Sequence, residues 1–407
     1  MFDISRIAKK YNSDLFTGMN MEDEERLTLT LQVGGNPDWM SRLPERLLDV
    51  PLWNLAIPGS HDSMSFCLDV SSPVLRSQPC LLRVIDRLFP CWTRPCVYRW
   101  ATTQQSVLSD QCDLGIRFLD LRIARKPAGG SKLFFAHGIY TLISVKEALD
   151  ELATWLDAHP KEIVVISCSH FESLTDEDHF HLTDYIITLF GKKLCSSQDI
   201  PTLRSCWSRG QQVIVSYGNQ QMVLQHPELW TGIPYWYADS ADPKKVIAYL
   251  EDQQHRGRPA GFYVSGLNLT EDAAYVLLHP LQDMRKMTTR ALSLLLRWAG
   301  EQRPGRQAGG VNILCCDFVD ISPFCSLVIG LNHKLLAATP PVCSMPPRAS
   351  RSHVIGCCHS KPTGDQAWEN TSNSDSPRPA SYQPCHCPQN KMTTSMCNVT
   401  VGRSLKR

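Results

Sequence analysis

The sequence predicts an α/β protein whose central part is a distorted (β/α)8 barrel of the TIM type. A block of about 300 residues, 36–336, is rich in aliphatic and aromatic residues and has no low-complexity break. Within it, short apolar runs suited to strands alternate with amphipathic segments suited to helices. Several of the runs are continuous and β-branched, which is typical of parallel strands buried on both faces.

The two ends of the chain differ from this block in composition. Residues 337–407 are rich in Pro and Ser, poor in large aliphatic residues and net basic. Such a segment buries too little apolar surface to offset the entropy lost on ordering, so we expect a disordered tail. Residues 1–35 are polar and patternless, and we expect a flexible arm there.

Charge and cysteine content exclude several classes of protein. The 407 residues carry 41 Lys+Arg against 40 Asp+Glu, which does not suit a nucleic-acid-binding protein. An odd count of 17 Cys, without a secretory signal, does not indicate a disulfide scaffold. We therefore expect reduced thiols and a cytosolic protein, with Cys80, Cys91 and Cys96 buried and free. No apolar run is long enough for a transmembrane helix.

Strands and helices are predicted in alternation. The predicted strands are 52–57, 118–123, 133–136, 163–167, 213–217, 262–265 and 311–315. Ser144 and Glu147 have capping-box spacing before a helix over 145–158, and Gly191 ends a helix over 176–190. Further helices are predicted over 243–254, 290–302 and 324–336. The rival fold, an open doubly wound sheet, would need a Gly-rich phosphate loop after the first strand, and the sequence has none.

Polar residues suited to catalysis follow the predicted strands, where the active sites of barrel enzymes lie. They are His61 and Asp62 in IPGSHDS, Asp120 and Arg122 in DLR, His137 before Gly138, and Asp317 in CCDF. Singly, each has a structural explanation, such as a turn or an ion pair. Two imidazoles, one guanidinium and several carboxylates at one rim together indicate a catalytic site.

This set of side chains suits in-line attack of a hydroxyl at a phosphodiester. One neutral His removes the proton of the attacking hydroxyl, and a second, protonated His delivers one to the leaving oxygen. Arg neutralises charge on the non-bridging oxygens, and carboxylates fix the tautomer of each imidazole. A triad of Ser60, His61 and Asp62 is rejected, because the members of a triad come from positions far apart in the chain.

The same motifs resemble the X domain of phosphatidylinositol-specific phospholipase C. IPGSHDS is followed by GIRFLDLR (115–122) and FAHG (135–138). More closely, the chain is similar to the small X domain-containing proteins of this family, which have no PH, EF-hand, Y or C2 modules. The similarity covers residues 38–336 and includes DWM (38–40), PTLRSCWSRGQQVIVSY (201–217) and GLNLTE (266–271).

The resemblance implies a role for each catalytic candidate. His61 matches the general base that deprotonates the inositol 2-hydroxyl, and Asp317 matches the carboxylate that orients it. His137 matches the general acid that protonates the diacylglycerol oxygen, with Asp62 and Asp120 as its supporting carboxylates. Arg122 matches the arginine that stabilises the phosphate. The implied products are diacylglycerol and an inositol 1,2-cyclic phosphate, which the same residues would hydrolyse slowly.

The resemblance also bears on metal dependence. Animal signalling enzymes of this class bind Ca²⁺, and they carry Asn after the first His and two acidic residues in the second motif. Here those places hold Asp62, Asp120 and Arg122. A guanidinium at a Ca²⁺ ligand position repels the ion and can replace its charge. We therefore predict chemistry that needs neither Ca²⁺ nor any other metal or cofactor.

Further residues are predicted to bind the headgroup. Ser169 and His170 in SCSHFES stand where bacterial members place a Lys, and Tyr217 ends the predicted strand 213–217. Trp236 and Tyr237 in IPYWYADS suit stacking on the inositol ring, with packing in the core as an equal alternative. The lack of a Lys/Arg cluster argues against a strong preference for multiply phosphorylated inositides.

The substrate, membrane phosphatidylinositol, implies a transient peripheral contact with a membrane, on internal membranes if the protein is cytosolic. Residues 85–89, Trp92 and Trp100 are predicted to make it, and the basic tail adds attraction to anionic lipid. The alternative function is a catalytically weak or inactive phosphoinositide-binding or scaffold protein with the same fold. A glycerophosphodiester hydrolase would need a His-Arg-Gly motif and paired carboxylate metal ligands. The oligomeric state stays open.

Overall fold

The computed structural model describes residues 35–127, 129–279 and 282–337. The predicted arm and tail therefore lie outside the described residues, apart from Gly35 and Ala337. Nowhere in these ranges is a helix both long and apolar enough to cross a membrane.

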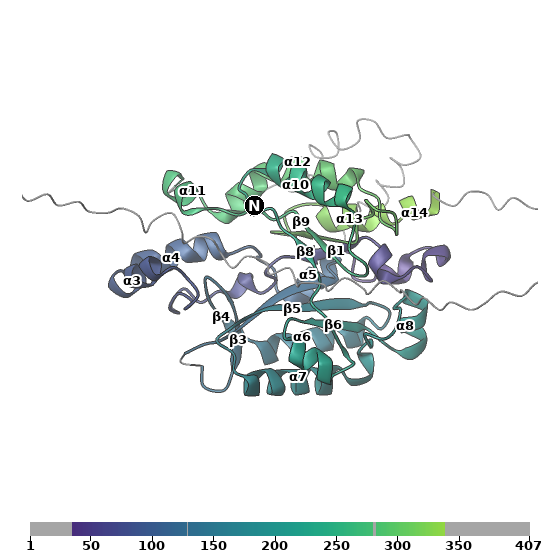
Figure 1. Ribbon diagram of the computed structural model, residues 1–407, viewed down its shortest axis with the longest axis horizontal. Helices are drawn as coiled ribbons and strands as arrows, with labels where there is room; N and C mark the ends of the chain where they lie inside the picture. Colours follow the sequence, from purple (N-terminus) through teal and green to yellow (C-terminus); the bar gives the residue numbers. More distant parts are fainter. Residues whose placement is uncertain (1–34, 128, 280–281, 338–407) are drawn as a thin grey trace, which may run out of the picture. The chain divides into compact units, whose positions relative to one another are not determined.

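A curled sheet of parallel strands occupies the centre (Figure 1). Along the sheet the strands are β7 (Leu229–Trp230), β6 (Val213–Tyr217), β5 (Val164–Glu172), β2 (Phe118–Arg125), β1 (Ile57–Ser60), β10 (Ile313–Cys316), β9 (Val264–Gly266) and β8 (Tyr235–Trp236). Every ladder on this path is parallel. Within the described residues no ladder joins β7 to β8, so the barrel is open at this seam. The predicted distorted barrel is confirmed.

Helices follow most of the strands and cover the outside of the sheet. They are α3 (Cys80–Leu88), α4 (Pro90–Ala101), α5 (Leu108–Leu114), α6 (Val145–Ala158), α7 (Asp176–Phe190), α8 (Leu203–Arg209), α9 (Gln220–Gln225), α10 (Pro243–Arg256), α11 (Ala273–Leu278), α12 (Met284–Glu301), α13 (Phe324–Leu331) and α14 (Lys334–Ala337). In Figure 1, α6 and α7 lie on one side of the sheet, and α10, α12 and α13 lie on the other.

The predicted helix bounds are confirmed where residues adjacent in the sequence cap the end of the helix. The Ser144 hydroxyl accepts from the Glu147 N–H, and the Glu147 carboxylate accepts from the Ser144 N–H at 2.8 Å, so α6 begins and ends as predicted. The bounds of α7 are confirmed as well. In contrast, α12 begins earlier than predicted because the Asp283 side chain caps it. The predicted helix 324–336 is two helices, α13 and α14.

The predicted strand 52–57 is wrong. Pro51 precedes a 3-10 turn at Leu52–Asn54, and β1 begins only at Ile57. Leu52 and Leu55 are nevertheless buried in the same cluster as Ile57, and Trp53 packs against that cluster. The run is apolar because it closes the amino-terminal end of the barrel, and burial there does not require a strand.

The predicted strand 133–136 exists but does not belong to the barrel. It forms β3 (Leu133–His137), which pairs antiparallel with β2 and with β4 (Ile139–Ser144). Gly138 makes the tight turn between β3 and β4 with a φ of +70°, a conformation that favours glycine. This hairpin carries His137 to the carboxyl end of the barrel strands.

The inside of the barrel changes from apolar to polar along the strands. Phe118, Val165, Ile214 and Ile313 meet in one buried cluster near the amino-terminal end. Because side chains alternate along a strand, the residues two and four positions after Phe118 face the same way. These are Asp120 and Arg122. The polar end of the interior is therefore the carboxyl end, where the predicted site residues lie.

A buried ion pair closes the opposite end. Glu162 Oε2 lies 2.7 Å from Arg117 Nη2, and neither side chain is exposed to solvent. The Glu162 carboxylate also accepts from the N–H groups of Met40 and Ser41, both at 3.2 Å. Arg117 Nη2 donates to the Pro37 carbonyl at 2.6 Å. The pair thus attaches the amino-terminal segment to strands β2 and β5.

Removing one partner of this ion pair should be costly, because the remaining charge stays buried and unpaired. We expect Glu162→Ala to lower the free energy of unfolding by about 3–5 kcal/mol, measured by denaturant titration. Arg204→Ala, which removes an exposed arginine paired with Glu45 and Asp49, is the control and should change stability little. Equal effects of the two substitutions would contradict the structural role of the pair.

Candidate active site

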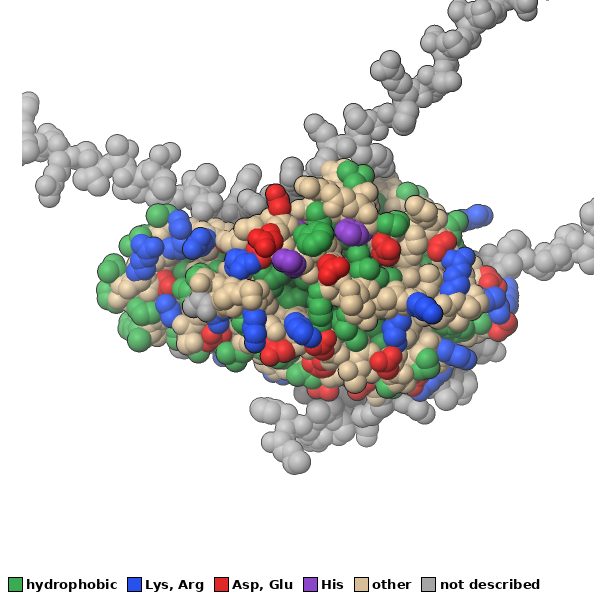
Figure 2. All heavy atoms as spheres, turned by 90° about the horizontal axis from the view of Figure 1, so that it is seen from below, with side chains coloured by type: hydrophobic (Ala, Val, Ile, Leu, Met, Phe, Trp, Pro, Cys, Tyr) green, Lys and Arg blue, Asp and Glu red, His purple; other side chains and the backbone are tan. Residues whose placement is uncertain are grey.

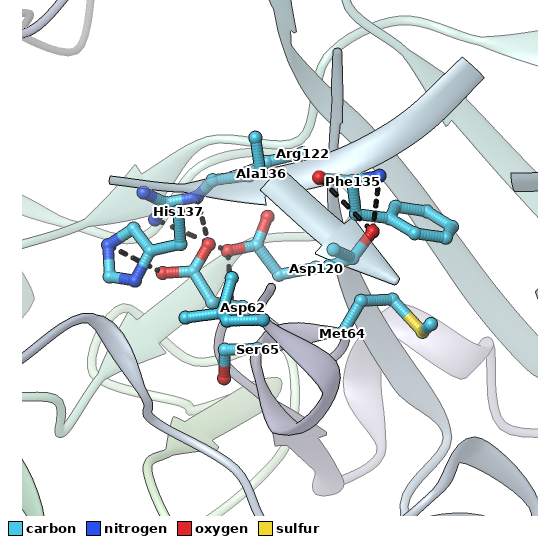
Figure 3. A pocket seen from close by; sticks show the side chains of 10 residues that line it. Asp62, Met64, Ser65, Asp120, Arg122, Phe135, Ala136 and His137 are labelled. Carbon is cyan, nitrogen blue, oxygen red and sulfur yellow. Dashed lines mark hydrogen bonds and ion pairs between the residues drawn. The ribbon is translucent and has the colours of Figure 1, made fainter. Parts of the chain in front are cut away.

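The carboxylate of Asp62 lies at the centre of the candidate site. Its Oδ2 is 3.2 Å from His61 Nε2 and 3.2 Å from His137 Nε2, and its Oδ1 pairs with Arg122 Nε. Figure 3 shows Asp62, Arg122 and His137 pointing toward one another. Asp62 lies two residues after the end of β1 and has a φ of 41°, a left-handed conformation that Asp tolerates better than most residues.

His61 is held from both sides of its ring. Nδ1 lies 2.7 Å from Asp317 Oδ1, and Nε2 lies 2.9 Å from Arg122 Nη2. A guanidinium can only donate hydrogen bonds, so the contact with Arg122 requires a lone pair on Nε2. The Nδ1 proton is then donated to Asp317. Nε2 is therefore the nitrogen of His61 at which a proton can be gained or lost.

His137 is oriented in the same way by a different acceptor. Its Nδ1–H donates to the Ala101 carbonyl at 2.7 Å, which leaves Nε2 facing Asp62. The centroids of the His61 and His137 rings are 6.2 Å apart. The two imidazoles thus present the same nitrogen to one carboxylate, one from just after β1 and the other from the end of β3.

Asp120 does not support His137 as predicted. Within the described residues its Oδ2 pairs with Arg122 Nη2 at 3.5 Å, and its Oδ1 accepts from Ser169 Oγ at 3.0 Å. The reason is the direction of β2, which brings Asp120 and Arg122 onto the same face two residues apart. Asp62 alone of the two predicted carboxylates contacts His137.

A β-bulge brings Ser169 and His170 to the site. Leu121 pairs with Cys168, but the next residue, Arg122, pairs with His170, so Ser169 is the extra residue on β5. Bulges of this kind re-aim side chains and are common beside active sites. Ser169 Oγ lies 2.9 Å from His170 Nδ1, and both side chains are exposed.

Burial and charge push the pKa values of the two histidines apart. Burial alone would lower the pKa of His61, but Asp62 and Asp317 outweigh it and raise this pKa above its usual value. Burial lowers the pKa of His137, and Asp62 opposes this only in part. Burial would also raise the pKa of Asp62, yet Arg122 and the two imidazoles lower it. Asp62 is therefore an anion between three groups that carry or accept positive charge.

Two of the predicted headgroup-binding residues lie elsewhere. Tyr217 is only 1% exposed, and its hydroxyl is 2.8 Å from His179 Nδ1, in the layer between the sheet and α7. Trp236 is buried against Tyr263, with ring centroids 4.5 Å apart. Neither side chain is placed to bind the headgroup, because both are packed in the core; for Trp236 the alternative of core packing is confirmed.

Two neighbours of Trp236, namely Tyr235 and Tyr237, lie where the side chain of Trp236 was expected. The ring of Tyr235, a residue absent from the sequence prediction, lies 6.3 Å from that of His61. Tyr237 is partly buried at the rim, where its hydroxyl contacts Thr270 and, at 3.2 Å, Asp239. Glu271 is a further residue near the site that the sequence did not predict. Burial and the nearby Asp317 raise its pKa to about 8. Strand alternation could have separated Trp236 from its neighbours, but β8 is too short to be recognised as a strand.

The donor set near Asp62 would in principle suit a cation. Ligand atoms of His61, Asp62 and Asp120 lie within 4.8 Å of one another. However, Arg122 pairs with both carboxylates, so a metal ion placed there would meet a fixed positive charge.

Comparison with proteins of known sequence identifies close relatives. No protein-family model matches the chain. The PI-PLC X domain-containing protein 1 of Danio rerio is 52% identical over 298 residues, which cover 72% of this chain and 96% of that protein. The human protein of the same name is 45% identical over 302 residues, 74% of this chain and 94% of that protein. The PI-PLC X domain-containing protein 3 of Danio rerio is 39% identical over 306 residues, 73% and 94% of the two chains.

Solved structures share the fold at much lower identity. The phosphatidylinositol-specific phospholipase C from Listeria monocytogenes matches with a TM-score of 0.50 and 17% identity, over 73% of this chain and 98% of that chain. A phosphatidylinositol-specific phospholipase C from Staphylococcus aureus matches with a TM-score of 0.52 and 18% identity, over the same shares. These similarities support the distorted barrel.

The contacts of Asp317 predict a selective change in titration. Asp317→Asn keeps an oxygen that can accept from His61 Nδ1 but removes the negative charge, so the pKa of His61 should fall. The Nδ1 of His137 is held by a carbonyl instead, so its pKa should change much less. NMR titration of the imidazole resonances measures both, with assignments from single His→Gln variants. An unchanged pKa of His61 would contradict the assigned pairing.

Proposed function

The chain belongs to the PI-PLC X domain-containing proteins, and on this premise we propose that it cleaves phosphatidylinositol to diacylglycerol and an inositol cyclic phosphate. The observation that carries the proposal is the arrangement of the two imidazoles. His61 and His137 present Nε2 from two sides of one small polar site, with the Arg122 guanidinium between the same groups. An acid, a base and a phosphate-binding cation are thereby brought together.

In the proposed reaction, an inositol hydroxyl attacks the phosphorus atom of the same headgroup. His61 Nε2 takes the hydroxyl proton as the new P–O bond forms, while Asp317 stabilises the resulting imidazolium through Nδ1–H. The bond from phosphorus to the diacylglycerol oxygen breaks, and His137 Nε2 donates a proton to that oxygen. The products are a cyclic phosphodiester and a neutral alcohol, so atoms and charge balance without water. Water can then open the cyclic phosphate by the reverse roles.

These roles require a protonation pattern opposite to that of the free protein, so we infer that bound substrate reverses it. In the free protein the pKa of His61 is raised and that of His137 is lowered, so a shared proton favours His61. A bound phosphodiester anion beside His137 favours the protonated form of that ring. It also replaces Asp62 as the partner of Arg122, whose planar guanidinium suits two phosphate oxygens.

We further propose that this chemistry proceeds without a metal ion. Arg122 already supplies positive charge at the centre of the site, in contact with Asp62 and Asp120. The cation that would otherwise neutralise the pentacoordinate transition state is then part of the chain. In the free protein the carboxylates of Asp62 and Asp120 hold the guanidinium, and its positive charge opposes the binding of Ca²⁺ beside them.

The proposed function predicts turnover in excess EDTA. We expect the wild-type chain to release diacylglycerol and cyclic phosphate from phosphatidylinositol vesicles, followed by ³¹P NMR. His61→Ala and His137→Ala should each lower kcat by about 10²–10⁴-fold, because each removes one proton transfer. His181→Ala, at an exposed histidine of α7, is the control. Lipid binding without turnover on any inositol lipid would instead favour a phosphoinositide-binding protein, and activity that requires Ca²⁺ would refute metal independence.

A basic and apolar surface on α3 and the start of α4 is proposed to contact the membrane. The exposed fractions of Leu88, Phe89 and Trp92 are 66%, 62% and 85%. Arg87 is exposed on the same helix. Figure 2 shows apolar and basic side chains intermingled at the α3 end of the molecule. Such a surface suits an anionic bilayer, in which the apolar side chains insert and the arginine meets lipid phosphates.

Two predictions about this region need correction. Trp100 is only 4% exposed and packs against Tyr275, with ring centroids 5.9 Å apart, so it does not belong to the surface. Cys80 and Cys91 are exposed rather than buried, and Cys96 is partly buried. The surface is linked to catalysis through α4, because the carbonyl of Ala101, the last residue of α4, accepts from His137.

Replacing Leu88, Phe89 and Trp92 together by Ala should weaken vesicle binding by at least about tenfold, since each side chain contributes apolar area to insertion. Co-sedimentation with vesicles of phosphatidylcholine and phosphatidylinositol measures the effect. Leu224→Ala, at a leucine of α9 that is even more exposed than Leu88, is the control and should bind as wild type does. Unchanged vesicle binding of the triple variant would show that another surface of the protein contacts the membrane.

A further inference from the structure

A chain of hydrogen bonds connects the β5 bulge to the candidate site. Ser169 Oγ lies 3.0 Å from Asp120 Oδ1 and 2.9 Å from His170 Nδ1. Asp120 in turn pairs with Arg122 through Oδ2. The chain therefore runs from the exposed imidazole of His170 through Ser169 and Asp120 to the phosphate-binding guanidinium of Arg122.

The protons of this chain can be assigned from the donor inventory. The Asp120 carboxylate is an acceptor, so the single hydroxyl proton of Ser169 is donated to it. Ser169 Oγ can then only accept from His170, which puts a proton on Nδ1 of that ring. In a neutral His170 the other nitrogen, Nε2, therefore carries a lone pair. Among the described residues no protein group is recorded within hydrogen-bond distance of this Nε2.

The surroundings favour the neutral form of His170. Its charged neighbours are Arg122 and Asp120 on β2 and His61 and Asp62 after β1. The surrounding residues partly desolvate the exposed ring, and this effect together with the positive charge of Arg122 lowers the pKa of His170, although the two carboxylates oppose it. Near neutral pH the imidazole thus offers an acceptor, not a positive charge, on the strand position paired with Arg122.

We propose that His170 is a specificity-determining residue, whose Nε2 accepts a hydrogen bond from a free hydroxyl of the inositol ring and so disfavours headgroups phosphorylated at that hydroxyl. This inference rests on the proposed function and deepens it. A hydroxyl carries the proton that the Nε2 lone pair needs. A phosphomonoester dianion has no such proton and places its oxygens against the lone pair.

Ser169 is the positioning residue in this arrangement. Its hydroxyl fixes the Nδ1–H tautomer, and the bulge that inserts it also turns His170 toward Arg122. Without the hydroxyl, His170 can rotate or place its proton on Nε2, and the preference for an acceptor at this point is lost. Sites that hydrogen-bond a substrate hydroxyl discriminate strongly against analogues that cannot donate there.

The test measures headgroup preference by binding, so that it does not depend on turnover. Calorimetry compares myo-inositol 1-phosphate with inositol bisphosphates that carry a second phosphate at position 3, 4 or 5, on the full chain. Wild type should prefer the monophosphate over at least one bisphosphate. His170→Lys should reduce that preference about tenfold, because an ammonium donates to phosphate. Ser169→Ala should reduce it several-fold, and Ser169→Thr, which keeps a hydroxyl, should retain it.

His181→Lys adds the same charge on α7 and serves as the control. An unchanged preference in both His170→Lys and Ser169→Ala would overturn the inference, as would an equal loss in His181→Lys. The same variants assayed on phosphatidylinositol separate this inference from the proposed function. Headgroup binding with the expected preference but no turnover would refute the enzyme while leaving His170 as the selective group. Turnover of phosphatidylinositol, together with an unchanged headgroup preference in the variants, would support the enzyme and refute the role of His170.

Discussion

The buried carboxylate of Asp62 is the constraint on which the candidate site depends. An anion with almost no access to water is stable only when positive or proton-donating groups surround it. Here they come from three places: His61 beside it, Arg122 on β2 and His137 on the β3–β4 hairpin. Each of these groups is fixed in turn by another acceptor, namely Asp317, Asp120 and the Ala101 carbonyl. The arrangement of the site therefore follows from the need to neutralise the negative charge of Asp62.

The barrel supplies the rigidity that such a cluster needs. Neighbouring parallel strands end at one rim, so β1, β2 and β10 deliver His61, Arg122 and Asp317 to the same point without long loops. At the other end, the apolar cluster around Phe118 and the Arg117–Glu162 pair fill the interior. One end of the molecule is thus packed for stability, and the other keeps its polar groups concentrated around the site.

Much of this was predictable from the sequence, and the failures have physical causes. The capping-box spacing of Ser144 and Glu147 located α6, the helix-ending Gly191 located α7, and β-branched runs located β5 and β6. Strand pairing is not a local property, so β3, which belongs to the β3–β4 hairpin, was mistaken for a barrel strand. Burial alone suggested a strand over 52–57, where the chain makes a 3-10 turn. The alternation of Tyr235, Trp236 and Tyr237 was missed because a two-residue strand has no pattern of its own. The bulge at Ser169 leaves no signature in composition, and so the link from His170 to Asp120 emerged only from the structure.

The most direct test of this account is the titration of both histidines in Asp62→Asn. The charge of Asp62 favours the protonated forms of both His61 and His137, although burial leaves the pKa of His137 lowered. Among the described residues Asp317 is paired with His61 and not with His137. If Asp62 is the common partner, this single substitution lowers both pKa values, as followed by NMR of the imidazole resonances in the full chain. A fall confined to one histidine, with the other unchanged, would contradict the arrangement of both imidazoles around a single carboxylate.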